Sequence, residues 1–166
     1  VIVEEDVENL PQDMTVYKVS ESREALTVIA GNFYEHPSKK LNMIGVTGTN
    51  GKTSTTYFME SILNTIGHKT GVIGTVETRI GGKKRDIKFA TSTTPDTLDL
   101  NAILKLMADE NVEDLVMEVS SQGLMLHRTA GIPFEIGIFT NLGRDHIGPN
   151  EHKDFDDYKR CKGLLF

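Results

Sequence analysis

The sequence predicts an α/β protein: a mostly parallel sheet that contains a phosphate-binding loop (P-loop) and is flanked by helices, behind a short remnant of an N-terminal domain. Three observations predict this class. Strand and helix patterns alternate from residue 42 onward, which is typical of a parallel sheet covered by helices. A glycine-rich loop ending in Lys52-Thr53 lies between an apolar strand and an amphipathic helix. Later apolar strands end in polar residues, at the edge where open sheets bind ligands.

Residues 1–41 have a different pattern from the rest of the chain. They are expected to form two short strands and one helix: Val1–Val3, Thr15–Val19 and Ser22–Tyr34. Ser20 is the expected N-cap of this helix, because its hydroxyl can accept a hydrogen bond from a free N–H of the first turn. The polar, proline-containing segment 36–40 then leads into the sheet, and we place a domain junction there.

The strand before the phosphate loop runs from Met43 to Val46, and a helix follows the loop. In that helix Phe58, Ile62 and Ile66 recur at i, i+4 and i+8, so we expect this stripe to pack against the sheet. Gly67 marks the end of the helix, since glycine readily adopts the left-handed conformation that follows a last turn.

The remaining elements follow in order. A strand covers about Thr70–Val76, and Gly81–Lys84 is expected to be a hairpin or an exposed turn. Thr94-Pro95-Asp96 has the pattern of a helix start, with proline in the first turn and an acidic side chain near the positive end of the helix dipole. This helix extends to about Ala108. Two more strands are expected at Leu115–Val119 and Ile136–Thr140.

The composition excludes several other classes of protein. The 166 residues are enough for about one domain, and 24 acidic against 18 basic residues give a net charge of −6 without a basic stripe, so nucleic acid is not an expected partner. The single cysteine, Cys161, excludes an internal disulfide framework and indicates the cytoplasm. No apolar run approaches the roughly 18 residues of a membrane span, so no membrane partner is expected. Because the chain starts at Val1 and ends with the apolar Leu164–Phe166, we expect a fragment of a longer protein.

The phosphate loop carries the strongest functional signal. Its glycines allow a tight turn that presents backbone N–H groups to phosphate oxygens at the positive end of the following helix. Lys52 is expected to reach the β- and γ-phosphates of ATP, and the Thr53 hydroxyl to join the coordination of Mg²⁺. The loop is a G-x-x-G-K-T variant, because Val46 stands where the general pattern has its first glycine. The expected ATP-binding residues are Thr47, Gly48, Thr49, Asn50, Gly51, Lys52, Thr53 and Ser54.

Two later strands end in candidate site residues. Glu118 lies in an otherwise apolar strand, where a carboxylate is costly unless it is paired or bound to a cation, and this favours Glu118 as a Mg²⁺ ligand. Asp145 and His146 follow the next strand, at the same edge of a parallel sheet. An Asp-His pair in a loop is otherwise typical of a surface hydrogen bond, and histidine prefers softer metals than Mg²⁺.

Five motifs in this order resemble the Mur ligases, the ATP-dependent ligases of peptidoglycan synthesis, and among them most closely the branch that adds the third residue of the stem peptide. They are Thr47–Thr53, Ser92–Asp96, Met117–Ser121, Phe139–His146 and Asp157-Tyr-x-x-x-Lys162. Two positions depart from the commonest family pattern, since Gln122 stands where His is frequent and Ser92 where Asn is frequent. Both departures concern contacts to the substrate and leave the ATP site intact.

The resemblance implies a division of the chain. Residues 1–41 would be the end of the N-terminal domain that binds the UDP sugar, together with a linker. Residues 42–166 would be the first part of the central ATP-binding domain. The family's C-terminal domain, which binds the incoming amino acid, would be absent.

The resemblance also implies roles for single residues. Thr93, Thr94, Ser120 and Arg128 would bind the UDP-N-acetylmuramoyl dipeptide, and Thr53, Glu118, His146 and Lys162 would hold magnesium. The implied catalytic residues are Lys52, Glu118, His146 and Lys162. Lys162 would be carbamylated by CO₂, which requires a neutral amine and hence a buried site. Two alternatives remain open: a helix cap for the threonine pair, and a solvated surface position for Arg128, whose guanidinium otherwise suits a carboxylate or a phosphate.

The implied reaction is ATP-driven amide-bond formation. The γ-phosphoryl group would move to the D-glutamyl carboxylate of UDP-MurNAc-L-Ala-D-Glu, and the amine of meso-diaminopimelate or L-lysine would attack the acyl phosphate. The alternatives are another ligase of the superfamily, either a folylpolyglutamate synthase or a cyanophycin-synthetase-like enzyme, and a nucleotide-binding module without catalysis. We expect the chain by itself to be inactive in ligation.

Overall fold

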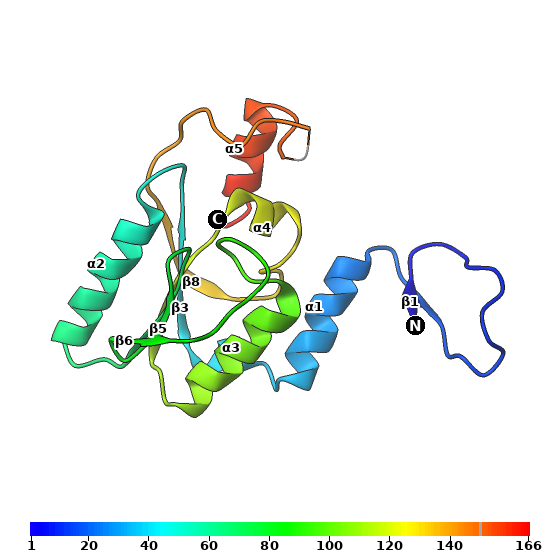
Figure 1. Ribbon diagram of the computed structural model, residues 1–166, viewed down its shortest axis with the longest axis horizontal. Helices are drawn as coiled ribbons and strands as arrows, with labels where there is room; N and C mark the ends of the chain where they lie inside the picture. Colours follow the sequence, from blue (N-terminus) through cyan, green and yellow to red (C-terminus); the bar gives the residue numbers. More distant parts are fainter. Residues whose placement is uncertain (150) are drawn as a thin grey trace.

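The structure is a computed structural model that describes residues 1–149 and 151–166. Its centre is a sheet with the strand order β6-β5-β4-β7-β3-β8 (Figure 1). The strands are β3 (Asn42–Thr47), β4 (Thr70–Ile73), β5 (Thr78–Ile80), β6 (Lys83–Arg85), β7 (Asp114–Glu118) and β8 (Phe134–Phe139). Four of them, β3, β4, β7 and β8, are parallel, and the β5–β6 hairpin continues the sheet in the antiparallel sense from β4. The predicted α/β class with a mostly parallel sheet is confirmed.

Helices cover both faces of this sheet (Figure 1). They are α1 (Ser22–Phe33), the 3₁₀ helix η1 (Pro37–Lys40), α2 (Lys52–Thr65), α3 (Thr97–Asp109), α4 (Ser121–Met125) and α5 (Phe155–Gly163). Successive strand residues point to opposite faces, so Met43 and Leu115 join the core under α3, whereas Ile44 and Val116 join the core under α2. The central strands β3 and β7 are therefore apolar between their first and last residues, as expected for strands buried on both faces.

The apolar stripe predicted to bury α2 is exposed instead. Phe58, Ile62 and Ile66 are 69%, 57% and 64% exposed, so the prediction that they pack against the sheet is wrong. Met59 and Leu63 pack there in their place. The first turn of α2 explains which face of the helix is buried. The Thr53 hydroxyl is hydrogen-bonded to Glu118 of β7, so the face that carries Thr53 is turned toward the sheet. Residues three, seven and ten positions further on lie on this same face.

The N-terminal segment forms a separate two-stranded parallel sheet followed by α1. The strands are β1 (Ile2–Val3) and β2 (Tyr17–Lys18). The N-cap of α1 is Glu21, whose carboxylate accepts a hydrogen bond from the Arg23 N–H, so the prediction of Ser20 as the cap is wrong by one residue. Helix α1 lies against α3 (Figure 1). Segment 36–40 is no exposed link, because Pro37 and Ser38 of η1 are buried.

Other element boundaries differ slightly from the predictions. Strand β4 ends at Ile73, and α3 begins at Thr97 with Asp96 as its N-cap, so Pro95 precedes the helix and does not lie in its first turn. The turn between β5 and β6 is formed by Gly81 and Gly82, both at positive φ, which confirms the predicted hairpin. Within the described ranges, no helix is long and apolar enough to cross a membrane.

Candidate active site

The carboxyl ends of four parallel strands converge at one edge of the sheet, and the predicted site residues lie there. The phosphate loop follows β3, Thr75 lies just beyond β4, Glu118 ends β7, and the segment 140–146 follows β8. In an open parallel sheet this edge is the usual place for a ligand, because the connections splay apart there.

The phosphate loop is held in place by backbone geometry and by the segment after β8. Gly48 has φ +144°, and a Cβ atom added to it would lie 1.9 Å from the Thr140 Oγ1 atom, so no other residue fits there. The N–H groups of Thr49 and Asn50 donate to the carbonyl and side-chain oxygens of Asn141, at 3.0 Å each. The first turn of α2 then starts at Gly51, its N-cap, with φ +82°.

Two lysines point at the same loop. The Lys52 Nζ atom donates to the carbonyl oxygens of Gly48 and Thr49 at 2.9 and 3.0 Å, and the Lys162 Nζ atom donates to the Gly48 oxygen at 2.8 Å. Burial lowers the pKa of Lys52. Burial and, secondarily, the nearby Lys52 charge lower the pKa of Lys162 to about 8. Lys162 is 1% exposed, and its amine is therefore easier to deprotonate than that of a surface lysine.

Glu118 is 1% exposed and its carboxylate is surrounded by donors. The Thr53 hydroxyl donates to Oε1 at 2.9 Å, the Thr75 N–H donates to the same oxygen at 3.0 Å, and the Thr75 hydroxyl donates to Oε2 at 3.1 Å. These bonds explain how a carboxylate is tolerated at the end of a buried strand. The approach is close, because a Cβ atom on Gly74 would lie 2.5 Å from Oε1.

A polar cavity brings together six of the predicted residues from distant parts of the chain. It is lined by Lys52, Ser92, Thr93, Ser120, Ser121, Gln122, Arg128, His146 and Lys162. A larger hollow of about 430 Å³ lies beside Ile132, Phe134 and Leu165 and contains none of the predicted site residues. We place the site in the smaller cavity, because its lining carries the charges and hydroxyl groups that a nucleotide and a carboxylate substrate need.

The predicted substrate residues differ in how they face this cavity. Thr94 is fully buried, and its hydroxyl accepts from the Ser120 N–H at 2.9 Å and donates to the Glu118 carbonyl at 3.2 Å. It ties the loop before α3 to the end of β7 and does not line the cavity. The Ser120 hydroxyl caps α4 by accepting from the Gly123 N–H at 2.9 Å.

Arg128 is held beside the cavity by two contacts. Its Nη1 atom donates to the Thr94 carbonyl at 3.2 Å, and its Nε atom lies 2.7 Å from the Asp96 carboxylate. The buried Nε atom makes no hydrogen bond in this contact. A guanidinium has five N–H donors, so the part of Arg128 that lines the cavity keeps donor capacity for another acceptor. His146 lies at the cavity in a left-handed backbone conformation, with its Nδ1 atom 2.9 Å from the Glu151 carboxylate.

Tyr158 is a site residue that the analysis of single motifs missed. It is fully buried, its hydroxyl lies 3.0 Å from the Thr49 hydroxyl of the phosphate loop, and its ring centre lies 4.6 Å from the Lys162 Nζ atom. The spacing of Tyr158 in the sequence could have identified it, because a residue four positions before Lys162 lies on the same face of a helix. Thr75 and Gly74 were also missed, since only the sheet brings them to Glu118.

The donor set fits a hard divalent cation and a polyphosphate. Thr53 and Glu118 offer adjacent oxygen atoms, which Mg²⁺ prefers. The first turn of a 14-residue helix and two lysines provide positive charge beside them.

Comparisons with known proteins agree with this geometry. Residues 46–166 match the Mur ligase middle domain. The chain is similar to the UDP-N-acetylmuramoyl-L-alanyl-D-glutamate–2,6-diaminopimelate ligases of Clostridium botulinum, with 45% identity over 100% of this chain and 34% of that protein, and of Clostridium perfringens, with 47% identity over 99% and 33%. The chain thus spans about a third of the length of these relatives.

Solved structures give the same picture of the fold. A diaminopimelate ligase of the same name matches with a TM-score of 0.77 and 25% identity, over 99% of this chain and 32% of that one. Escherichia coli FolC in complex with DHPP and ADP matches with a TM-score of 0.65 and 22% identity, over 96% and 42%, a likeness that shows a shared fold alone. The phosphate loop and the buried Glu118 agree with the match to the family's middle domain over residues 46–166. On that match, this chain belongs to the Mur ligase family.

Proposed function

We propose that this chain supplies the ATP- and magnesium-binding part of a ligase that joins 2,6-diaminopimelate to UDP-N-acetylmuramoyl-L-alanyl-D-glutamate. The hydrogen bond between Thr53 and Glu118 carries the proposal, because it pairs the last position of a G-K-T loop with a buried carboxylate at the end of β7. The names of the relatives support diaminopimelate as the amino acid. In this proposal residues 1–41 belong to a UDP-sugar domain and residues 42–166 to the central domain.

The start of α2 is the proposed phosphate site. The N–H groups of Thr49 and Asn50 already donate to Asn141. We therefore expect the phosphate oxygens to bind the N–H groups of residues 51–53, at the positive end of the helix dipole. Lys52 bonds to its own loop carbonyls. We expect its ammonium group to exchange these partners for phosphate oxygens, which carry a full negative charge.

Thr53 and Glu118 are the proposed first magnesium ligands. His146 and Lys162, which line the polar cavity, are the proposed further ligands. When bound, Mg²⁺ neutralises the charge of the phosphates in a phosphoryl transfer. Lys162 has the property that carbamylation needs, because its lowered pKa leaves about a tenth of the amine neutral near pH 7. As a carbamate it would exchange a positive for a negative charge beside the metal ligands.

The remaining residues of the cavity are proposed to bind the muramoyl dipeptide. Arg128 can orient the reacting D-glutamyl carboxylate, since its guanidinium is rigid and partly unpaired. Thr93 and Ser120 can donate to oxygen atoms of the same substrate. Thr94 does not reach the substrate and instead holds Ser120 in place by accepting its N–H. Catalysis here consists of positioning two reactants and balancing their charge.

The test is ADP release by the full-length protein with UDP-MurNAc-L-Ala-D-Glu and either meso-diaminopimelate or L-lysine. We expect turnover with diaminopimelate and little with L-lysine. A folate as the carboxylate substrate is the matched alternative, and turnover with it in place of the muramoyl dipeptide would refute the proposal. The 166-residue chain is expected to bind ATP and to release no ADP.

A further inference from the structure

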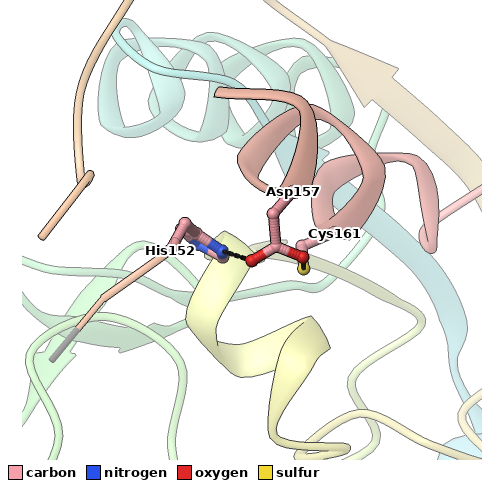
Figure 2. Close-up of side chains that lie close together, drawn as sticks. All are labelled: His152, Asp157 and Cys161. Atoms are coloured by element: carbon pink, nitrogen blue, oxygen red, sulfur yellow. Dashed lines mark hydrogen bonds and ion pairs between the residues drawn. The ribbon is translucent and has the colours of Figure 1, made fainter. Parts of the chain in front are cut away.

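Three potential metal ligands cluster on the side of α5 that faces α4, outside the proposed ATP site. Figure 2 shows His152, Asp157 and Cys161, which we call the α5 cluster. Their ligand atoms all lie within 4.8 Å of one another. The His152 Nδ1 atom is 3.4 Å from Asp157 Oδ2, and the Cys161 Sγ atom is 3.8 Å from Asp157 Oδ1. His152 and Cys161 are fully buried.

The local sequence brings these three residues together. Asp157 and Cys161 are four positions apart on α5 and therefore share one face of the helix. His152 precedes the N-cap of α5, and its backbone N–H donates to the His146 carbonyl at 3.1 Å, which fixes the segment before the helix. The second nitrogen of its ring, Nε2, lies 2.8 Å from the hydroxyl of Ser121. The imidazole is thus held at one nitrogen and turns the other toward Asp157.

We infer that His152, Asp157 and Cys161 form a binding site for a thiophilic divalent cation such as Zn²⁺. Imidazole, carboxylate and thiolate are the three ligand types that zinc takes in proteins, and three protein ligands leave a fourth position for water. The Ser121 hydroxyl occupies the place of an outer hydrogen-bond partner, which orients a metal-bound histidine. Mg²⁺ is not the expected ion at the α5 cluster, because Mg²⁺ prefers oxygen ligands and two of the three ligand atoms here are nitrogen and sulfur.

The Arg160 side chain competes with a metal ion for two residues of the α5 cluster. The Arg160 Nη2 atom donates to Asp157 Oδ1 at 2.7 Å and to the Cys161 sulfur at 3.4 Å, so it holds the two atoms that the metal needs. The Arg160 side chain is 62% exposed, and it can withdraw into solvent when the cation enters beside Asp157. Binding converts the Cys161 thiol to a thiolate, with one proton released to water and one metal–sulfur bond formed.

The pH dependence of binding follows from this proton. A thiol must lose its proton before its sulfur binds a metal ion, so metal and proton compete for Cys161. Affinity is expected to rise about tenfold per pH unit while one proton is released. This dependence separates the α5 cluster from an adventitious surface site made of carboxylates.

The experiment is a Co²⁺ titration of the chain, read from the thiolate-to-cobalt charge-transfer absorption, followed by displacement with Zn²⁺. We expect one equivalent to bind with a Kd on the order of 1 µM, with no displacement by excess Mg²⁺. Cys161→Ser should abolish the absorption. Arg160→Gln should tighten binding several-fold, whereas Lys159→Gln, which removes the same charge one position away, should bind like the wild type.

Two results would overturn the inference. One is the absence of a thiolate band in the wild type at millimolar Co²⁺. The other is a band of equal strength in Cys161→Ser. Circular dichroism of each variant shows that the fold is intact, and His152→Asn provides a second ligand deletion, which should weaken binding while the thiolate band remains at higher Co²⁺ concentration.

Discussion

At the scale of single residues, the site depends on how one buried carboxylate is accommodated. Glu118 ends a fully buried strand, and three donor groups from Thr53 and Thr75 satisfy it. Its position also requires an empty volume beside it, which only Gly74 leaves. The cost of burying a charge identifies Glu118 from the sequence, but no local pattern identifies Gly74, which lies just beyond β4 and 44 residues earlier in the chain.

Gly74→Ala is predicted to disturb Glu118 and with it the metal site. The new methyl group would lie 2.5 Å from the Oε1 atom, so the carboxylate must move and lose part of its bonding to Thr75. We expect the Mg²⁺ requirement of the full-length protein, measured as half-saturating Mg²⁺ in ADP release, to rise about tenfold. Gly143→Ala is the control, because the nearest atom to its added carbon is 3.8 Å away. An unchanged requirement in Gly74→Ala would contradict the role of Glu118.

Lys52→Ala is predicted to abolish ATP turnover by the full-length protein. Lys52 is the charged side chain of the loop itself and lies at the start of α2, so its loss removes the charge that balances the transferred phosphoryl group. ADP release should fall at least a hundredfold, or about 3 kcal/mol in the barrier. Activity above a tenth of the wild-type rate would refute the assigned role.

At the scale of elements, α2 shows how a functional contact can override an apolar pattern. The stripe of Phe58, Ile62 and Ile66 has good helical spacing, yet the bond from Thr53 to Glu118 sets the rotation of the helix and leaves the stripe outside. Periodicity identifies the helix and its length correctly. It does not identify the buried face when polar residues also occupy that face.

Adjacent residues of α2 are therefore predicted to respond differently to truncation. Leu63→Ala should lower the free energy of unfolding by about 2 kcal/mol, because Leu63 packs against the core of β3 and β7. Ile62→Ala should change it by less than about 0.5 kcal/mol, because the side chain is 57% exposed. Urea unfolding of the two variants measures both values. Equal losses would show that the stripe is buried after all.

The loop between α2 and β4 contains a pH-dependent contact. The His68 Nδ1 atom lies 2.5 Å from the carboxylate of the buried Asp114 at the start of β7, and this hydrogen bond raises the pKa of His68. A group with a raised pKa in the folded state stabilises the fold fully below its unfolded value of about 6.5 and loses that effect as pH rises through the folded value.

The stability difference between the wild type and His68→Gln is thus predicted to shrink with rising pH. It should be largest near pH 5.5 and smallest near pH 9, as measured by urea unfolding at a series of pH values. His36→Gln serves as the control, since that imidazole has no carboxylate partner among the described ion pairs. A difference that grows with pH would contradict the assignment of the contact.

At the scale of the whole molecule, one edge of the described parallel sheet remains open. Strand β8 lies at the edge of the described sheet, and its Ile136 and Phe139 side chains are 49% and 44% exposed. Helix α2 packs on β3, β4 and β7, and its exposed apolar stripe adds to the apolar surface. Unpaired backbone groups beside exposed apolar side chains favour pairing with another chain.

The 166-residue chain is predicted to self-associate as its concentration rises. Sedimentation velocity should show a growing fraction of dimer or larger species between about 5 and 200 µM. Ile136→Lys should reduce association, because a charge on an edge strand opposes edge-to-edge pairing. Ile136→Val, which keeps an apolar side chain at the same position, is the control. A monomer across the whole range would contradict the prediction.

The sequence by itself determined the order of the elements, the parallel sheet and the phosphate loop. These follow from local rules, because strand and helix periods, glycine in a tight turn and a lysine-threonine pair at a helix start are readable within about 15 residues. The segments with site residues were also readable, since polar residues at the ends of apolar strands meet at one edge.

Only the tertiary structure decided which side chains meet across that edge. Residues from separate elements meet in the contact of Glu118 with Gly74 and Thr75, in that of Tyr158 with Thr49, and in that of His152 with Ser121. The rotation of α2 and the burial of Lys162 are likewise set by packing across the sheet. These features depend on distances between elements and on which face each helix presents, and no local pattern in the chain specifies either quantity.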